Sequence, residues 1–384
     1  MVFERYIKNY LQEFNRLDRN SWNYEDGCVL IGAGQLYRAT GEDFYYDCIK
    51  NYIDRYVNEE GNIRGYEKEE YNIDRIPSGL VLFLLYEKTS QKKYLKAIKN
   101  LRTQLEHHPR TRSGNFWHKK IYPNQIWLDG LYMGMPFYLS YENLKGGEKG
   151  YKDILQQFNH VRSRLYDSEK KLYYHAYDES KQMFWADKKT GLSKNFWSRA
   201  MGWYVMALAD CLELFPEREK ECRKRLAELL VETVDGLLSY QDKESGLFYQ
   251  LTELGGTKGN YLETSASLMF AYGILKGVRL GVLDEKVYRG KGEEILIGVE
   301  TNMFSLKDGR LQLTGICKGA GLGPSENRYR DGSVDYYLKE EIVADEQKGV
   351  GAAMMVYGEW LLLKKEKPVM PADFPKVEIW NGRY

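Results

Sequence analysis

Six stretches of mostly apolar residues recur along the chain, and each contains small side chains such as glycine and alanine. A helix drawn through any of these stretches is apolar on nearly every side, which predicts six buried helices. The six stretches are residues 28–40, 79–89, 130–142, 199–214, 264–278 and 349–363.

Amphipathic stretches with a single apolar stripe alternate with the buried ones, and they predict an outer layer of helices. The outer helices are expected at residues 43–57, 94–105, 151–165, 222–238 and 283–299. The last buried helix has no amphipathic follower, but residues 3–14 supply one from the N-terminus. Six inner and six outer helices closed in this way predict an all-α fold, an (α/α)6 barrel forming one catalytic domain over residues 1–384. An open solenoid, the alternative, would need polar capping repeats.

Long loops lead from each outer helix to the next inner helix, whereas the links at the opposite end are short. Long loops are usually functional, so we expect the site at the long-loop end. Glycines beside apolar or aromatic pairs predict short hairpins in these loops. The inner helices begin there, and their N-termini favour an anionic ligand. Many tyrosines and tryptophans in the loops suggest a sugar acid, with simple packing of the barrel top as the alternative.

The composition excludes several classes of protein. The 384 residues carry a formal net charge of +1, which argues against a nucleic-acid binder or a membrane-surface protein, since both usually need a basic excess. Charges in the first residues and the lack of a long apolar run argue against a signal peptide or a membrane span, so we expect a cytoplasmic protein. Five scattered cysteines predict buried free thiols without a zinc site. The sequence does not predict an oligomeric state.

Asp129 is the first candidate for chemistry, because it stands between Trp127 and an apolar helix. Its structural interpretation is an N-cap of that helix, a role that suits aspartate. A wall formed by Trp127 would instead exclude water and raise the carboxyl pKa into the range of a general acid. Asp26 and Asp74 stand in similar places before inner helices. Asp74 and Asp129, on adjacent helices, would also be compatible with inverting glycosidase chemistry.

Arg199 stands in the first turn of a predicted helix, where a cation opposes the helix dipole. Either a substrate carboxylate gripped by both guanidinium nitrogens or a salt bridge to Asp187 or Glu263 would compensate it. Trp203, one turn later, would project to the same side. Residues 319–323 read GAGLG, but a polar segment follows them instead of a helix, so we expect a rim loop and no dinucleotide site.

Two of the five histidines lie in long loops among aromatic residues. His118 and His175 could donate to sugar hydroxyls or transfer protons, or could simply hold a loop by hydrogen bonds. Lys119, beside His118, could bind a carboxylate or remain solvated. The other three histidines, His107, His108 and His160, fall on or beside outer helices and are expected at the surface.

Several motifs resemble glycoside hydrolase family 105, the unsaturated rhamnogalacturonyl hydrolases. They span most of the chain in the family's order. They are IWLDGLYMGMPF at 126–137, WSRAMGWY at 197–204, FWHK at 116–119, YHAYD at 174–178, ETSAS at 263–267, DGSVDYY at 331–337 and KGVG at 348–351. The motifs at 126–137 and 197–204 together form a fairly specific combination.

This resemblance implies an (α/α)6 barrel that removes a Δ4,5-unsaturated galacturonyl residue from pectin lyase products by hydrating the double bond. Asp129 would protonate C4 and then accept a proton from the water that adds at C5. The implied partner is a small acidic oligosaccharide, and neither a cofactor nor a metal is expected. By the same resemblance Asp74 would hold ring hydroxyls or water. The other implied substrate-binding residues are His118, Lys119, Trp127, His175, Trp197, Arg199 and Trp203.

Other functions stay open from the residues alone. A sugar epimerase or isomerase on a helical barrel could use His118 and His175 as an acid–base pair. A related unsaturated glucuronyl hydrolase, an inverting hydrolase of saturated sugars that uses Asp74 with Asp129, and a barrel that only binds acidic oligosaccharides are the further alternatives.

Overall fold

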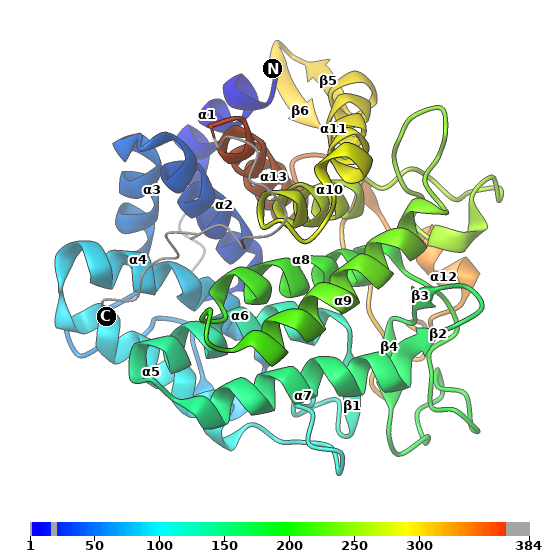
Figure 1. The fold of residues 1–384 in the computed structure, drawn as a ribbon, viewed down its shortest axis with the longest axis horizontal. Coiled ribbons are helices and arrows are strands. Elements are labelled where there is room, and N and C mark those ends of the chain that lie inside the picture. Colours follow the sequence, from blue (N-terminus) through cyan, green and yellow to red (C-terminus); the bar gives the residue numbers. More distant parts are fainter. Residues whose placement is uncertain (1, 17–20, 366–384) are drawn as a thin grey trace.

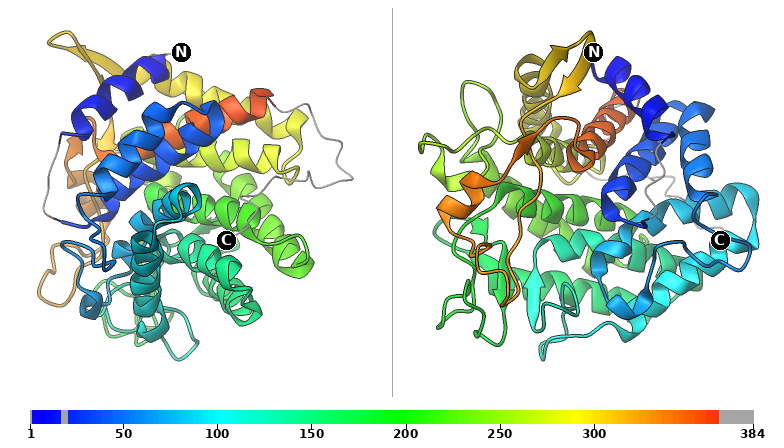
Figure 2. Two further views of the ribbon diagram at one scale, coloured as in Figure 1. Left: turned by 90° about the vertical axis from the view of Figure 1, so that its left-hand side faces the viewer. Right: turned by 180° about the vertical axis from the view of Figure 1, so that it is seen from behind.

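The computed structural model describes residues 2–16 and 21–365, which form a barrel of helices with its loops gathered at one end (Figures 1 and 2). Within these ranges the inner helices are α2 (Tyr24–Thr40), α4 (Leu80–Thr89), α6 (Asp129–Lys145), α8 (Ser198–Leu214), α10 (Thr264–Arg279) and α13 (Gln347–Lys365). The outer helices are α1 (Val2–Phe14), α3 (Asp43–Ile53), α5 (Lys92–His107), α7 (Glu148–Leu165), α9 (Lys220–Leu238) and α11 (Glu285–Asn302).

The inner helices pack against one another in chain order, and α13 packs against α2, which closes the ring. Each outer helix packs on the inner helix that precedes it, as α3 does on α2, and α1 packs on α13. The predicted (α/α)6 barrel is therefore confirmed, including the closing role of the N-terminal helix.

Burial follows the two predicted hydrophobic patterns. Every residue of α10 is buried, whereas α1 buries a single stripe made of Phe3, Tyr6, Ile7, Leu11 and Phe14. Each large apolar side chain moved from water into such a core contributes about 1.5–3 kcal/mol, so the seam between the two layers holds the barrel together. The five cysteines are free and buried, as predicted. No helix in the described part of the chain is long and apolar enough to cross a membrane.

Short antiparallel strand pairs organise the loops. β2 (Tyr166–Asp167) with β3 (Leu172–Tyr173) and β5 (Phe304–Lys307) with β6 (Arg310–Leu313) are the expected hairpins. β7 (Ile316–Cys317) pairs with β8 (Ile342–Val343) across most of the last loop. β1 (Gln125–Trp127) pairs with β4 (Ala176–Asp178), which belongs to a different loop. The prediction of one local hairpin per loop is thus only partly right, because some pairs join separate segments.

The strands β2, β3 and β4 and the short helix α12 (Val334–Lys339) lie together at the right of Figure 1. This is the end at which the long loops meet. One surface prediction near it is wrong: His108 is buried at the end of α5, and its Nε2 lies 2.8 Å from the Trp117 carbonyl oxygen. The loop that follows α5 folds back over this histidine, which a helix-face pattern cannot anticipate.

Candidate active site

The pairing of β1 with β4 brings Asp129 next to His175. Trp127 is opposite Ala176 in this ladder, and the amide of Leu128 donates to the His175 carbonyl oxygen at 3.0 Å. Asp129 follows at once as the first residue of α6. The start of α6 and the start of β4 therefore lie side by side, and the side chains of Asp129 and His175 meet at the barrel mouth.

Asp129 is not an N-cap. Leu128 holds that position and makes no side-chain capping bond, so the N-cap interpretation is wrong. Asp129 is only 8% exposed, and its Oδ2 has no hydrogen-bond partner but lies 3.5 Å from His175 Nε2. Burial, followed by the negative charge of Asp74, raises the pKa of Asp129 to about 7, against the opposing effect of its own backbone N–H. A carboxylic acid can therefore hold its proton near neutral pH.

His175 is completely buried and supports Asp129. Its Nδ1 lies 2.7 Å from the Tyr337 hydroxyl, which α12 carries, while Nε2 faces Asp129. Burial keeps the pKa of His175 well below the ordinary value, and the charges of His118, Arg330 and Arg199 act in the same direction. The imidazole is accordingly neutral at physiological pH and can orient the Asp129 carboxyl without an ionic bond.

Asp74 has the opposite environment. It lies in a short 3-10 turn, with Lys119 Nζ 2.7 Å from its Oδ2 and His118 Nε2 3.3 Å from its Oδ1. Burial raises the pKa of Asp74, but Lys119 and then His118 outweigh that effect and hold the pKa below its usual range. His118 itself has a pKa lowered by burial, so Lys119 is the cation of the pair. Asp74 is thus ionised beside a protonated Asp129, a separation of pKa values typical of acid–base sites.

An aromatic wall lies over these groups. The Trp127 ring stacks on His118, with centroids 4.5 Å apart, and on Tyr122 at 4.8 Å, while its edge meets His175 at 5.3 Å. The predicted wall around Asp129 therefore also fixes the two loop histidines. Because each histidine is already tied to Asp74 or to Tyr337, the pair is poorly arranged for the exchange of protons that an epimerase would need.

Trp197 and Arg199 form the side of the site contributed by α8. The Trp197 ring lies 4.7 Å from the His175 ring, and the Arg199 guanidinium lies 5.0 Å from the Trp197 ring centre. Arg199 is 1% exposed and donates to the Ser265 hydroxyl and the Cys317 carbonyl oxygen, while its Nε has no partner.

The salt bridge to Asp187 or Glu263, offered above as the alternative to a substrate carboxylate, does not form among the described residues. Glu263 caps α10 instead, accepting from the Ala266 amide at 2.7 Å, and Asp187 bonds within its own loop. Arg199 is therefore a buried cation at a helix N-terminus that forms no ion pair within contact distance in the described chain, although the charges of Glu263 and Glu346 help to raise its pKa. Such a group favours an anionic ligand.

Trp203 lies deeper in the barrel than the sequence suggested. Its ring stacks on Tyr132 at 5.0 Å and meets the edge of Tyr24 at 6.4 Å. It forms the floor of the site. Tyr24, Tyr337 and Arg330 are neighbours of the site that were not singled out as individual residues. The signal that could have found them is position, because each stands in or next to a long-loop segment that returns to the mouth.

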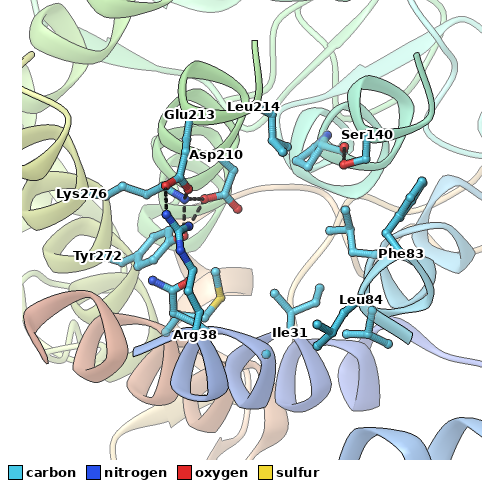
Figure 3. A pocket seen from close by; sticks show the side chains of 16 residues that line it. Ile31, Arg38, Phe83, Leu84, Ser140, Asp210, Glu213, Leu214, Tyr272 and Lys276 are labelled. Atoms are coloured by element: carbon cyan, nitrogen blue, oxygen red, sulfur yellow. Dashed lines mark hydrogen bonds and ion pairs between the residues drawn. The ribbon is translucent and has the colours of Figure 1, made fainter. Parts of the chain in front are cut away.

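A cavity of about 130 Å³ lies inside the barrel at the end opposite the loops (Figure 3). Apolar side chains such as Ile31, Phe83 and Leu84 form one wall, and Arg38, Asp210, Glu213, Tyr272 and Lys276 form the other. Ion pairs join its charged groups, with Lys276 Nζ 2.7 Å from Asp210 Oδ1 and 2.6 Å from Glu213 Oε2. This wall is a satisfied structural network, unlike the groups at the mouth. In residues 2–16 and 21–365 we find no cluster of three His, Cys, Asp or Glu residues suited to a metal.

The helical barrel carries one protonated and one ionised carboxyl group at an aromatic mouth, which fits a glycoside hydrolase. Comparison with known proteins shows that the chain is of this class. The model of Glycosyl Hydrolase Family 88 matches residues 2–364, and the chain belongs to this family.

Solved structures and known relatives agree with this assignment. A family 105 glycoside hydrolase from Clostridium acetobutylicum (C. acetobutylicum ATCC 824) is 44% identical, covers 93% of this chain and 98% of its own, and superimposes with a TM-score of 0.88. The resemblance to family 105 is therefore confirmed. The unsaturated rhamnogalacturonyl hydrolase YesR of Bacillus subtilis is 27% identical over 73% of this chain and 76% of its own length. Protein Atu3128 of Agrobacterium fabrum is 41% identical over 61% of this chain and all of its own.

Proposed function

We propose that the enzyme releases an unsaturated galacturonyl residue from the non-reducing end of pectin lyase products by adding water to the C4=C5 double bond. The observation that carries the proposal is Asp129, a buried acid with a pKa of about 7 and a carboxyl oxygen, Oδ2, without a hydrogen-bond partner. A relative of the chain, YesR, is named an unsaturated rhamnogalacturonyl hydrolase, which supports this substrate class.

The reaction begins with proton transfer from Asp129 to C4. The double bond is part of an enol ether, so the positive charge that develops at C5 is shared with the ring oxygen. The Asp129 carboxylate then takes a proton from the water that attacks C5, and the acid is restored. The resulting hemiketal opens to a ketone at C5, which leaves a hemiacetal at C1 that expels the partner sugar. One carboxyl group suffices, whereas ordinary glycosidases use two.

Neighbouring residues bind and orient the sugar in this proposal. Arg199, buried and without an ion pair in the described chain, would hold the substrate carboxylate on C5 from the side of α8. Ionised Asp74 would accept from ring hydroxyls or water, and Trp197 and Trp203 would supply aromatic faces. His118 and Lys119 would border the next sugar. The aromatic wall of Trp127 would exclude water and keep Asp129 protonated until the substrate arrives.

We further propose that the substrate is a small acidic oligosaccharide and that the enzyme acts in the cytoplasm on imported fragments. Five free cysteines suit a reducing compartment.

Heavy water tests the central step. With an unsaturated rhamnogalacturonan disaccharide in deuterium oxide, we expect loss of the ultraviolet absorbance of the double bond and one deuterium at the former C4 in the product. Product formed without deuterium at that carbon would refute proton donation to the alkene. Equal activity on the saturated disaccharide would instead favour ordinary inverting hydrolysis.

A further inference from the structure

Arg330 is a cation at the rim of the site that the proposed mechanism does not use. It lies in the loop between β7 and α12, and its side chain is half-buried. It forms no ion pair with any carboxylate in the part of the chain that the structure describes. The tyrosine hydroxyls of Tyr122 and Tyr336 lie beside it.

Gly321 lies close to both Arg330 and the aromatic wall. A methyl group added at Gly321 would lie 1.7 Å from Arg330 Nη2 and 3.2 Å from Trp127 Cζ3, so the guanidinium and the indole edge both contact this glycine. The Gly321 amide donates to the Tyr336 hydroxyl at 3.0 Å. Arg330 and the indole edge of Trp127, the ring that stacks on His118 and meets His175, therefore approach the same glycine.

The loop that carries Arg330 is fixed at both ends. The Gly323 amide donates to the Arg330 carbonyl oxygen at 2.8 Å, which closes the loop on itself. Next to Arg330, the Asn195 side chain donates to the Gly332 carbonyl oxygen at 2.7 Å, and Lys194 pairs with Asp331 at 3.1 Å. A cation on an anchored loop loses little additional freedom when it binds a ligand, which favours recognition over a merely solvated charge.

The three cations of the site differ in availability. Lys119 is paired with Asp74, and Arg199 is enclosed beneath Trp197. Arg199 and Lys119 are the cations that most lower the pKa of Asp129, whereas the charge of Arg330 acts on His118 and His175. Gly321 contacts both Arg330 and the edge of Trp127, and the Trp127 ring stacks on His118. In the proposed function His118 borders the next sugar, so Arg330 lies on the side of the site toward which the leaving part of a substrate would extend.

We propose that Arg330 forms a subsite for a second anionic group, a carboxylate or a sulfate, on the leaving part of the substrate, an inference that rests on the proposed function. The guanidinium fork matches either oxyanion with two parallel hydrogen bonds. The preferred substrates are unsaturated uronyl oligosaccharides whose leaving part carries an acid within one or two sugars of the broken bond.

The test compares three substrates that share the unsaturated ring and differ in a neutral, a carboxylated or a sulfated leaving sugar. We expect Arg330→Gln to raise KM about tenfold or more for an acidic substrate and less than about twofold for the neutral one, with kcat little changed. Gly321→Ala, which displaces the guanidinium but keeps its charge, should reproduce the effect. Gly319→Ala is the matched control, because an added methyl there meets no atom within 4 Å.

Binding to the Asp129→Asn chain, measured by calorimetry with the same compounds, separates this subsite from the reaction. Selective loss of affinity for the carboxylated compound in the added Arg330→Gln background assigns a carboxylate, and loss for the sulfated compound assigns a sulfate. Equal changes for all three compounds overturn the subsite. If the wild-type chain turns over none of them but still shows charge-selective binding through Arg330, the proposed reaction fails and the subsite stands.

Discussion

The two ends of the barrel bury similar polar groups in different ways. At the end opposite the loops, Glu213 accepts from Arg38 at 2.5 Å, from Lys276 at 2.6 Å and from Arg279 at 2.8 Å. At the loop end, Asp129 Oδ2 has no hydrogen-bond partner, although the side chain is buried to a similar degree.

This difference separates stability from chemistry. A buried polar atom without a partner costs about 1–3 kcal/mol, so each one calls for an explanation, and use by a ligand is one such explanation. The network around Glu213 satisfies its charges within the protein and leaves nothing for a ligand. The mouth keeps Asp129, the Nε2 atom of His175 and the Nε atom of Arg199 without hydrogen-bond partners. A substrate could supply those partners, which supports the mouth as the candidate active site.

The largest expected effect at the loop end is on the turnover rate of the Asp129→Asn variant. The amide cannot donate an acidic proton, so we expect kcat to fall by about 10²- to 10⁴-fold, measured by the loss of absorbance of an unsaturated disaccharide. Asp210→Asn at the opposite end is the matched control, and it should lower stability while kcat of the folded enzyme stays within twofold. An Asp129→Asn chain that retained a tenth of the activity would exclude this residue as the acid.

At the opposite end the expected loss is in folding. Glu213→Gln removes the charge shared by buried Lys276 and Arg279 and by half-buried Arg38, so we expect the free energy of unfolding to fall by about 3–5 kcal/mol. Urea denaturation followed by circular dichroism measures this change. KM and kcat of the folded variant should match the wild type. A stability within about 1 kcal/mol of the wild type would mean that the network contributes little.

A third prediction concerns pH. The pKa of Asp129 is raised to about 7 in the folded chain, against an ordinary carboxyl value of about 3.9. The folded state holds this proton more tightly, so its contribution to stability is complete below about pH 4 and is lost as the pH rises toward 7. In the proposed mechanism the acid form is also the active form, so kcat/KM should fall about tenfold per pH unit above 7.

Paired measurements with Asp129→Asn check the sign of this linkage. The stability of the wild type relative to the variant should decline from pH 4 to pH 7 and then level. Asp74 must behave in the opposite way, because its lowered pKa makes a contribution that is lost as the pH falls. A relative stability that rose between pH 4 and pH 7 would contradict the assignment of Asp129 as the protonated carboxyl.

The sequence predicts the barrel well because its signal is repeated and local. Each inner helix is apolar on all sides and each outer helix has one stripe, so twelve elements and their order follow from periodicity. The loops carry no such period. The ladder from Trp127 to Ala176 joins segments almost fifty residues apart, and no local pattern specifies that register.

Individual site residues were predictable only where their place along the chain fixes their role. Asp74 lies shortly before an inner helix and Asp129 begins one, so their location at the mouth follows from the barrel. Their opposite protonation depends on Lys119 and on burial, which are contacts across loops. Of the two alternatives for Arg199, the salt bridge to Glu263 does not form, because Glu263 caps its own helix instead. Arg330 was missed because a polar loop resembles any solvated rim until Gly321 is seen to hold the guanidinium in place.

The ladder between β1 and β4 also indicates how such an enzyme can diversify. Successive residues of a strand face opposite sides, so a slip of one residue would turn the neighbourhood of His175 away from Asp129. Insertions elsewhere in the two loops need not disturb this three-residue register. Natural variation can therefore lengthen or rewrite the rim, and with it the choice of sugar, while Asp129 keeps its setting beside His175.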